Sequence, residues 1–257
     1  MNFVDTPKQQ SYDIAGRKLF IAIPAYDFKI SLKSAISLAQ FAQLAAKHGV
    51  GLVIGNVSGC SVVSKARNLL VKEFMATDCT DMLFIDADIN FDPADVTRLL
   101  AWTVDRNIVA AVPRTRKTDG IYIAVLDNTS GFLQMDDMGL VKAGRVATAF
   151  MMIQRKVIET LVETHPEWQY IDPQSGETLN AVFDFKVTPA GYMGEDFLFC
   201  DRAREHGFDV WIDPTIKLGH MGVQEYPGDY GNDVLYPMIA DQQKKDAEAA
   251  MPTESAA

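Results

Sequence analysis

The amino-acid sequence predicts an α/β protein built on a Rossmann-like, doubly wound and mostly parallel sheet. Two observations lead to this fold class. Short and almost entirely apolar runs, typical of strands buried on both faces, alternate with longer amphipathic segments over residues 17–112. One of these runs, 82–85, leads directly into two carboxylates, Asp86 and Asp88. Because ligands bind at the carboxyl ends of parallel strands, the same pattern predicts where a site lies.

The composition is that of a globular protein with no obvious affinity for nucleic acid. The chain has 257 residues and a net charge of −10, which argues against non-specific phosphate binding. Segment 113–117 is the one candidate basic patch, with a solvated loop as the alternative. No apolar run is long enough for a membrane span and no signal-peptide core is present, so we expect a cytoplasmic protein without membrane insertion. Cys60, Cys79 and Cys200 are expected to be reduced thiols.

The first half is predicted to follow the order β-α-β-α-β-α-β, which implies right-handed crossover connections. Pro24 ends the first strand, Gly49 ends the first helix and Pro93 opens the third helix. Residues 1–16 are polar and aperiodic, and we expect them to form a flexible arm. The expected strands are 18–24, 50–57, 82–85 and 108–112, and the expected helices are 31–48, 62–76 and 93–105.

The second half, 113–240, is expected to form a smaller mixed region of the same domain, which spans 17–240. Segment 165–193 contains Pro, Gly and scattered aromatics without a period, which predicts a mobile or substrate-covering loop. The Ala-, Gln- and Glu-rich residues 241–257 are predicted to be disordered. The expected strands are 122–126, 132–135, 140–142, 148–153 and 210–212, and the expected helices are 155–164 and 194–205.

Four motifs occur in a recognisable order along the chain. They are Ile23-Pro24-Ala25-Tyr26, Asp86-Ala87-Asp88, Gly194-Glu195-Asp196 and Leu218-Gly219-His220. Together with Arg67-Asn68 and segment 149–155, they resemble GT-A-fold glycosyltransferases, especially the small soluble bacteriophage-type members, over about residues 18–222. The resemblance implies a metal-dependent transferase that moves a sugar from a nucleotide-sugar donor, with a UDP-sugar favoured, to a hydroxyl acceptor. Residues 17–112 would then bind the nucleotide, and 113–240 would bind the acceptor and complete the metal site.

The aspartate motif suits a divalent metal. Hard carboxylate oxygens are ligands for Mg²⁺ or Mn²⁺, and an added imidazole favours Mn²⁺. The resemblance implies that Asp88 is the direct ligand, that Asp86 contacts the ribose or a metal-bound water, and that His220 closes the metal shell. The alternatives are solvated loop carboxylates ahead of a helix capped by Asp92, and a packed histidine after a strand.

The resemblance implies that Asp196 is the base that removes the acceptor proton in an inverting reaction, with Glu195 positioning the acceptor or supporting the loop. Carboxylates at a helix start also interact favourably with the helix dipole, which would by itself account for both residues. Retaining relatives with the same aspartate and histidine motifs exist, so the stereochemical outcome stays open.

The donor-binding residues implied by the resemblance lie at the ends of the first and third strands, except for Arg67, which lies in the predicted helix 62–76. Tyr26 would stack on the base or pack on a helix, and Arg67 would reach the base or diphosphate or else pair on a helix surface. Arg114 and Lys117 are candidates for contacts with phosphate or acceptor. The full donor-binding set is Pro24, Ala25, Tyr26, Arg67, Asp86 and Ala87.

The chain departs from the family pattern in two places. Residues 147–149 replace a glycine-rich turn, and segment 221–231 has no counterpart and is a candidate flap over the donor. A sugar-phosphate nucleotidyltransferase is an alternative, but that class needs a glycine-rich, arginine-containing loop after the first strand, which is not present here. A non-catalytic carbohydrate- or nucleotide-binding module is a further alternative. The sequence does not select the acceptor among a glycan, a protein, a small molecule and a modified DNA base.

Overall fold

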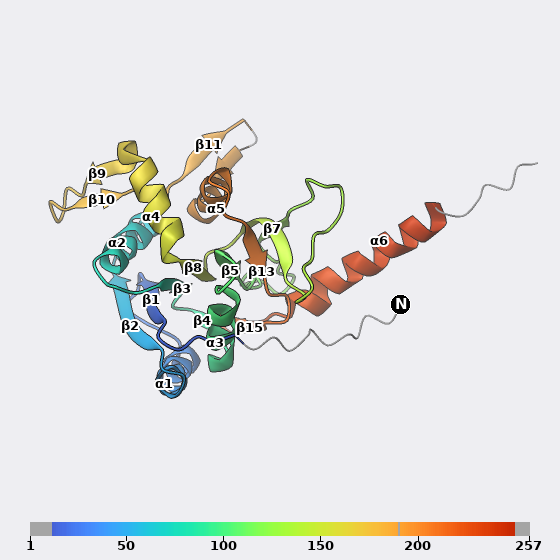
Figure 1. The fold of residues 1–257 in the computed structure, drawn as a ribbon, viewed down its shortest axis with the longest axis horizontal. Coiled ribbons are helices and arrows are strands. Elements are labelled where there is room, and N and C mark those ends of the chain that lie inside the picture. The colour runs from blue at the N-terminus through green and yellow to red at the C-terminus, as the bar shows by residue number, and fades with distance from the viewer. Residues whose placement is uncertain (1–11, 190, 250–257) are drawn as a thin grey trace, which may run out of the picture.

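The computed structural model describes residues 12–189 and 191–249, and its centre is an eight-stranded sheet (Figure 1). The strand order is β2-β1-β3-β8-β5-β13-β7-β6. Within this sheet β8 and β7 run against the other strands, because β8 pairs antiparallel with β3 and β5, and β7 with β13 and β6. The bounds are β1 Lys18–Ala25, β2 Gly51–Ser58, β3 Asp81–Ile85, β5 Ile108–Ala110, β6 Ala124–Leu126, β7 Val141–Val146, β8 Phe150–Gln154 and β13 Val210–Ile212.

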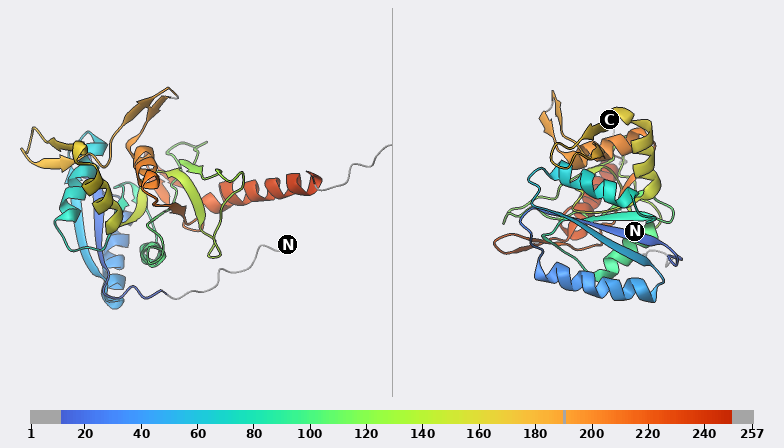
Figure 2. Two further views of the ribbon diagram at one scale, coloured as in Figure 1. Left: turned by 45° about the horizontal axis from the view of Figure 1, so that its top comes forward. Right: turned by 90° about the vertical axis from the view of Figure 1, so that its left-hand side faces the viewer.

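Helices cover both faces of the sheet, which confirms the predicted doubly wound α/β class (Figure 2). Successive residues of β1 supply opposite layers, since Phe20 belongs to one apolar cluster and both Leu19 and Ile21 to the other. A strand buried on both faces must be apolar throughout, which is the pattern seen in the sequence. Helices α1 (Leu32–Lys47) and α3 (Pro93–Trp102) cover one face, and α2 (Val63–Met75), α4 (Arg155–Thr164) and α5 (Glu195–Glu205) cover the other.

The second half differs from the prediction in its strands. No regular strand forms at 132–135, where Met135 makes only an isolated bridge to Val141. A side chain here takes hydrogen bonds that a strand would otherwise use. Asp136 Oδ1 accepts from the backbone nitrogens of Met138 and Leu140 at 2.9 Å, which forms a turn. The predicted strand 140–142 therefore begins one residue later and continues as β7.

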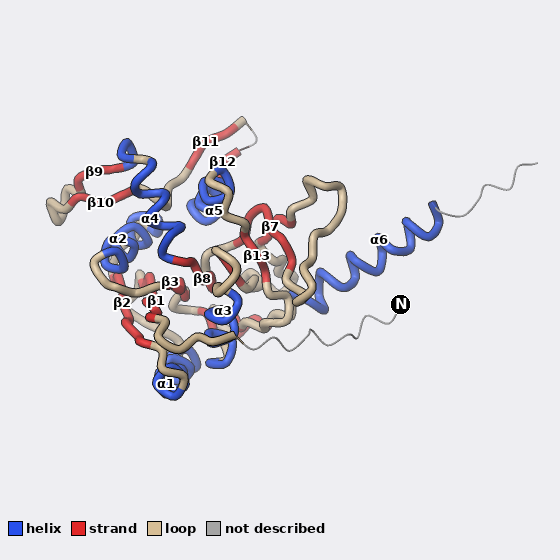
Figure 3. The backbone as a smooth tube through the Cα atoms, in the orientation of Figure 1, coloured by secondary structure: helices blue, strands red, loops and turns tan. Residues whose placement is uncertain are grey.

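Segment 165–193, predicted as a loop, contains two small hairpins and a 3-10 turn, Pro166–Trp168 (Figure 3). Strand β9 (Gln169–Ile171) pairs with β10 (Thr178–Asn180), and β11 (Lys186–Thr188) pairs with β12 (Gly191–Met193). Each strand has three residues and side chains that are largely exposed, so no apolar period marks them in the sequence.

A separate three-stranded sheet lies beside the aspartate motif. Strand β14 (Gly219–Met221) pairs with β15 (Glu225–Pro227) on one side and with β4 (Ile89–Asn90) on the other. In this register His220 lies opposite Ile89, the residue that follows Asp88. The pairing brings the late histidine motif to the carboxyl end of β3.

The C-terminal part corrects one expectation. A π-helical turn, Gly231–Leu235, leads into α6 (Tyr236–Ala249), which projects from the body in Figure 1, whereas the sequence predicted disorder from residue 241. Ion pairing one helical turn apart supports this polar helix, since Lys245 Nζ lies 2.8 Å from Asp241 Oδ2. Residues 250–257 lie outside the described residues, as do 1–11 of the expected arm. No helix within the described ranges is long and apolar enough to cross a membrane.

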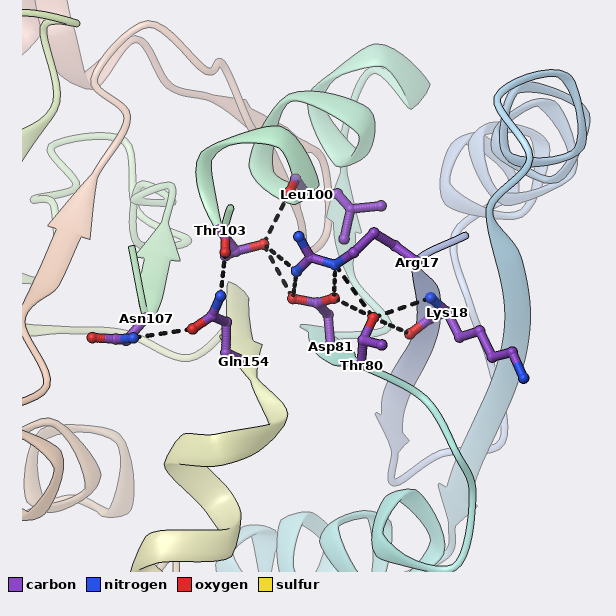
Figure 4. A network of polar contacts seen from close by, with 8 residues as sticks. All are labelled: Arg17, Lys18, Thr80, Asp81, Leu100, Thr103, Asn107 and Gln154. Carbon is purple, nitrogen blue, oxygen red and sulfur yellow. Dashed lines mark hydrogen bonds and ion pairs between the residues drawn. The ribbon is translucent and has the colours of Figure 1, made fainter. Parts of the chain in front are cut away.

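A buried polar network joins the amino ends of β1 and β3 (Figure 4). Asp81 is fully buried at the start of β3, and Arg17 Nε donates to its carboxylate at 2.9 Å. Thr103, which follows α3, donates to the same carboxylate at 3.1 Å, and Gln154 of β8 donates to the carbonyl of Thr103. The network therefore fixes two strands of the sheet to α3 at the end away from Asp86.

Candidate functional site

A cavity of about 730 Å³ opens at the carboxyl ends of β1 and β3. This is the edge at which ligands bind in open α/β sheets. Five of the six sequence-predicted donor-binding residues, all except Arg67, line the cavity, as does Asp88. The lining is Pro24, Ala25, Tyr26, Asp27, Lys29, Ile30, Ser31, Cys60, Ser61, Val63, Ala66, Asp86, Ala87, Asp88, Arg116, Met221 and Gly222.

Asp88 and His220, both predicted metal ligands, lie together. His220 Nε2 is 3.4 Å from Asp88 Oδ2, and His220 Nδ1 donates to the carbonyl of Arg114 at 2.7 Å. The backbone continues the contact, because Met221 N donates to Asp88 O at 2.7 Å. Burial opposes a charged imidazole, but the hydrogen bonds to Asp88 and to the Arg114 carbonyl outweigh it, so the pKa of His220 is raised.

Arg116 is the basic residue of segment 113–117 that reaches the site. Its Nη1 lies 3.0 Å from Asp88 Oδ2, and its side chain lines the cavity. The predicted candidate Arg114 instead donates to the carbonyls of Gly120 and Thr118 and so shapes its own loop. Lys117, the other predicted candidate, is exposed and does not line this cavity. The sequence alone offered no signal for choosing among the three cations.

Arg67 does not line the cavity but connects the two acidic motifs. It is 3% exposed; its Nη2 lies 3.1 Å from Asp86 Oδ1, and its Nε lies 3.3 Å from Glu195 Oε1. Nη1 has no hydrogen-bond partner within the described part of the chain. Arg67 therefore reaches the cavity wall through Asp86, and its direct contact with a donor stays a prediction.

Glu195 and Asp196 form the first turn of α5, where their carboxylates face the positive end of the helix dipole. Glu195 is buried and its carboxylate is used by Arg67. Burial, and next the charge of Glu195, raise the pKa of Asp196 to about 6. Asp196 is half-buried and does not line the 730 Å³ cavity. It is thus a carboxylate of moderate basicity, and its neighbour Glu195 is the residue that Arg67 joins to the aspartate motif.

The chemistry of the donor set fits a divalent cation, although the side chains are not gathered into a closed cage. Across residues 12–189 and 191–249 no three His, Cys, Asp or Glu side chains form a ready metal-holding group. Asp88 and His220 are paired, while Asp86 faces Arg67. The carboxylates of Asp86 and Asp88 keep 31% and 34% of their side-chain exposure and lie on one cavity wall. The Arg116 guanidinium places a positive charge at Asp88, as a bound cation would.

The two departures from the family pattern both contribute to this edge. Met221 and Gly222 of the candidate flap 221–231 line the cavity, and Glu225 anchors the segment by accepting from Asn90 Nδ2 at 2.9 Å. In segment 147–149, the carbonyl of Ala149 accepts a hydrogen bond from Asp86 N at 3.0 Å. Both segments therefore position the aspartate motif.

A second cavity, of about 920 Å³, lies in the second half of the chain, beneath the start of α6. Its wall is mainly apolar and aromatic, and includes Tyr122, Phe132 and Tyr230. Arg114 lines this cavity, while its carbonyl binds His220. The loop that carries Arg114 and Arg116 therefore separates the two cavities.

Comparison with known proteins adds structural similarities only. No family model matches the sequence, and no curated protein matches it. A197 from STIV is 17% identical over 80% of this chain and 86% of that chain, with a TM-score of 0.47. The 4-diphosphocytidyl-2C-methyl-D-erythritol synthase from Anaerococcus prevotii is 12% identical over 88% and 99%, with a TM-score of 0.44. Residues 1–349 of S. aureus TarS, in complex with UDP-GlcNAc, are 13% identical over 76% and 56%, with a TM-score of 0.39. The fold class of this chain is defined by its own strand order.

Proposed function

We propose that this chain is a metal-dependent glycosyltransferase that moves a sugar from a nucleotide-sugar donor, with a UDP-sugar favoured, to a hydroxyl acceptor. The observation that carries the proposal is the position of Asp86 and Asp88. Both line a cavity at the carboxyl ends of two parallel strands, and His220 is held against Asp88 by a separate sheet. This arrangement is suited to a ligand that carries phosphate and a metal ion.

The cavity has the size and the groups needed for a nucleotide sugar. Its volume of about 730 Å³ falls within the range of small-molecule sites. Tyr26 is 66% exposed at its wall and offers a ring face on which a base can stack. Lys29 and Arg116 supply positive charge for a diphosphate. A donor diphosphate would compete with Asp88 for Arg116.

Asp86, Asp88 and His220 would hold Mn²⁺, or Mg²⁺, in this site. The bound metal would neutralise the charge that builds up on the departing diphosphate, worth several kcal/mol. His220 is fixed for this role by the hydrogen bond from Nδ1 to the Arg114 carbonyl, which leaves Nε2 directed at Asp88. Arg67 keeps Asp86 in place by binding the Oδ1 atom.

Asp196 is the proposed base. A carboxylate with a pKa of about 6 is ionised at pH 7 to 8 and is still basic enough to take a proton from an attacking hydroxyl. Glu195 would act indirectly, by fixing the start of α5 through Arg67. An inverting reaction is the favoured outcome.

The test is release of UDP from a panel of nucleotide sugars, measured with Mn²⁺ or with EDTA. We expect one donor to be hydrolysed slowly in the presence of metal, and this activity to be lost in Asp88→Asn. Asp137→Asn, which makes the same charge change in an exposed loop, should retain it. If no donor is hydrolysed and calorimetry also detects no metal-dependent nucleotide binding, the proposal must be abandoned. Release of pyrophosphate from a nucleoside triphosphate would indicate a nucleotidyltransferase instead.

A further inference from the structure

Two histidines outside the proposed active site lie with their ring nitrogens facing each other. His165 follows α4 and His206 follows α5, and their Nε2 atoms are 3.1 Å apart. The ring planes are nearly perpendicular, at 79°. Such a distance normally requires a proton, or another cation, between two nitrogen atoms.

The partners of the other ring nitrogens show that neither Nε2 carries a proton in the neutral rings. His206 Nδ1 lies 2.8 Å from the carbonyl oxygen of Arg202, which can only accept, so this nitrogen is the donor. His165 Nδ1 lies 2.7 Å from Glu167 Oε1. The hydrogen bond from His165 is the main cause of the lowered pKa of Glu167, so the carboxylate is ionised and accepts. Both Nε2 atoms are therefore left with lone pairs.

The hydroxyl oxygen of Thr164 directs a third lone pair toward His206 Nε2. Thr164 Oγ1 is 3.3 Å from His206 Nε2, and the hydroxyl of Thr164 donates its single proton to the carbonyl of Thr160. With that proton used, the oxygen presents a lone pair to the imidazole. Three electron-pair donors with no proton among them repel one another unless a cation lies between them.

We propose that His165 and His206 form a binding site for a borderline transition-metal ion such as Zn²⁺. Two Zn–N bonds at a tetrahedral angle span about 3.4 Å, slightly wider than the observed separation of 3.1 Å. Imidazole nitrogen suits Zn²⁺, Ni²⁺ or Cu²⁺ and not Mg²⁺, so this site would differ in selectivity from the carboxylate site at Asp88. Thr164 or water would complete the shell.

The outer contacts have the form found around metal-bound histidines, in which the second ring nitrogen donates to a carboxylate or a backbone carbonyl. His165 has Glu167 in this role, and His206 has the Arg202 carbonyl. Trp168 stacks on His165 with ring centroids 3.7 Å apart, which fixes the ring plane. The Arg202 guanidinium lies 3.9 Å from the centroid of Trp168, so it stabilises the indole but adds a nearby positive charge.

The site would join the ends of two helices. A metal ion held by both histidines connects the end of α4 to the end of α5, whose first turn carries Glu195 and Asp196. Binding would therefore restrain the helix that presents the proposed base. This effect does not depend on whether the chain transfers sugars.

The test uses the full-length protein, stripped of metal and titrated with Zn²⁺ at pH 8. The titration is carried out in the His220→Gln variant, so that Zn²⁺ cannot bind the imidazole beside Asp88. Two-bond ¹H–¹⁵N correlation spectra of the imidazoles should show the Nε2 signals of His165 and His206 moving together at one equivalent of Zn²⁺, and returning with EDTA. The melting temperature should rise with Zn²⁺ over the same range.

His206→Gln should abolish the Zn²⁺-dependent rise in melting temperature, and Glu167→Gln should weaken binding by about tenfold or more. His48→Gln, an exposed histidine after α1, should leave both readouts unchanged. If the signals of His165 and His206 do not respond to Zn²⁺, the proposal is wrong. It is equally overturned if the pair keeps a shared proton at pH 8 that Zn²⁺ does not displace.

Discussion

Arg67 Nη2 lies 3.1 Å from Asp86 Oδ1, so a buried cation on α2 fixes the first carboxylate of the aspartate motif. The same guanidinium binds Glu195 through Nε at 3.3 Å, so the motif at the end of β3 and the motif at the start of α5 share one partner. The guanidinium also lies over the Phe84 ring, 5.2 Å from its centroid. One buried guanidinium therefore joins the wall of the 730 Å³ cavity to the first turn of α5.

Replacing Arg67 by Met should destabilise the protein by about 3–5 kcal/mol, because Asp86 and Glu195 would lose their shared partner in a buried position. Urea unfolding measures this loss. Lys72 lies on the same helix as Arg67 and pairs with Glu177, which precedes β10; Lys72→Met removes this exposed pair and should cost less than about 1 kcal/mol. Equal losses in the two variants would show that the Arg67 contacts contribute no more to stability than an exposed ion pair does.

Replacing Asp81 by Asn should destabilise the fold by about 3 kcal/mol without changing the turnover of the remaining folded protein. The side chain is fully buried against Arg17 and Thr103, at the end of β3 opposite Asp86. The free energy of unfolding and kcat are measured on the same preparation. A fall in kcat at constant folded fraction would contradict the inference that the Asp81 end of β3 does not affect the site at its Asp86 end.

Asp196→Asn should lower kcat by about 10²–10⁴-fold and abolish an acidic limb in the pH–rate profile centred near the pKa of about 6. In the wild type, the rate should rise with pH through this value as the base ionises. Profiles of kcat for both proteins between pH 5 and 8 provide the comparison. A limb that survives the substitution would assign the ionisation to another group.

The substitution Asp196→Asn that lowers kcat should raise the free energy of unfolding. Because burial raises the pKa of Asp196 from its ordinary 3.8 to about 6, ionisation costs folding free energy at pH 8, and this cost disappears as the pH falls through about 6 toward 3.8. Asp196→Asn should therefore be more stable than wild type by about 1–3 kcal/mol at pH 8, and equal to it near pH 3.5. Denaturant titrations at the two pH values test this. A variant less stable at pH 8 would contradict the inferred cost.

Arg116→Met should raise the KM for the donor by about tenfold or more, because the side chain lines the cavity and supplies a charge suited to phosphate. Lys117→Met is the matched control, since its exposed side chain does not line the cavity. Initial rates over a range of donor concentrations distinguish KM from kcat. Equal effects of the two substitutions would mean that only the net charge of the loop matters.

The sequence predicted the fold class because β1 and β3 are apolar on both faces, and it indicated the position of the 730 Å³ cavity because Asp86 and Asp88 follow β3 directly. It did not predict the strand order. β8 inserts antiparallel between β3 and β5, and its first four residues, 150–153, are all buried, without an alternation that would indicate a partner. Strand order depends on contacts between distant segments, and local periodicity carries no record of those contacts.

In the site, too, some features could be predicted from the sequence and others depend on contacts between distant segments. The place of His220 depends on strands of two and three residues, β4 and β14, which are too short to show a period. Burial of Arg67 did have a signal in the sequence, because it occupies the first position of the stripe that Leu70, Val71 and Phe74 continue at helical spacing. A cation on an apolar stripe needs a buried acidic partner, and Asp86 and Glu195 fill that need.

The projecting helix α6 has a practical consequence for experiments on this protein. Its residues 243–247 are exposed, rise by 1.5 Å per residue along the helix and do not line the 730 Å³ cavity. A dye or surface linker attached at Lys244 would therefore leave the 730 Å³ cavity open to solution. Because a rigid helix follows the rotation of the body to which it is joined, fluorescence anisotropy of such a label would report binding of a large acceptor.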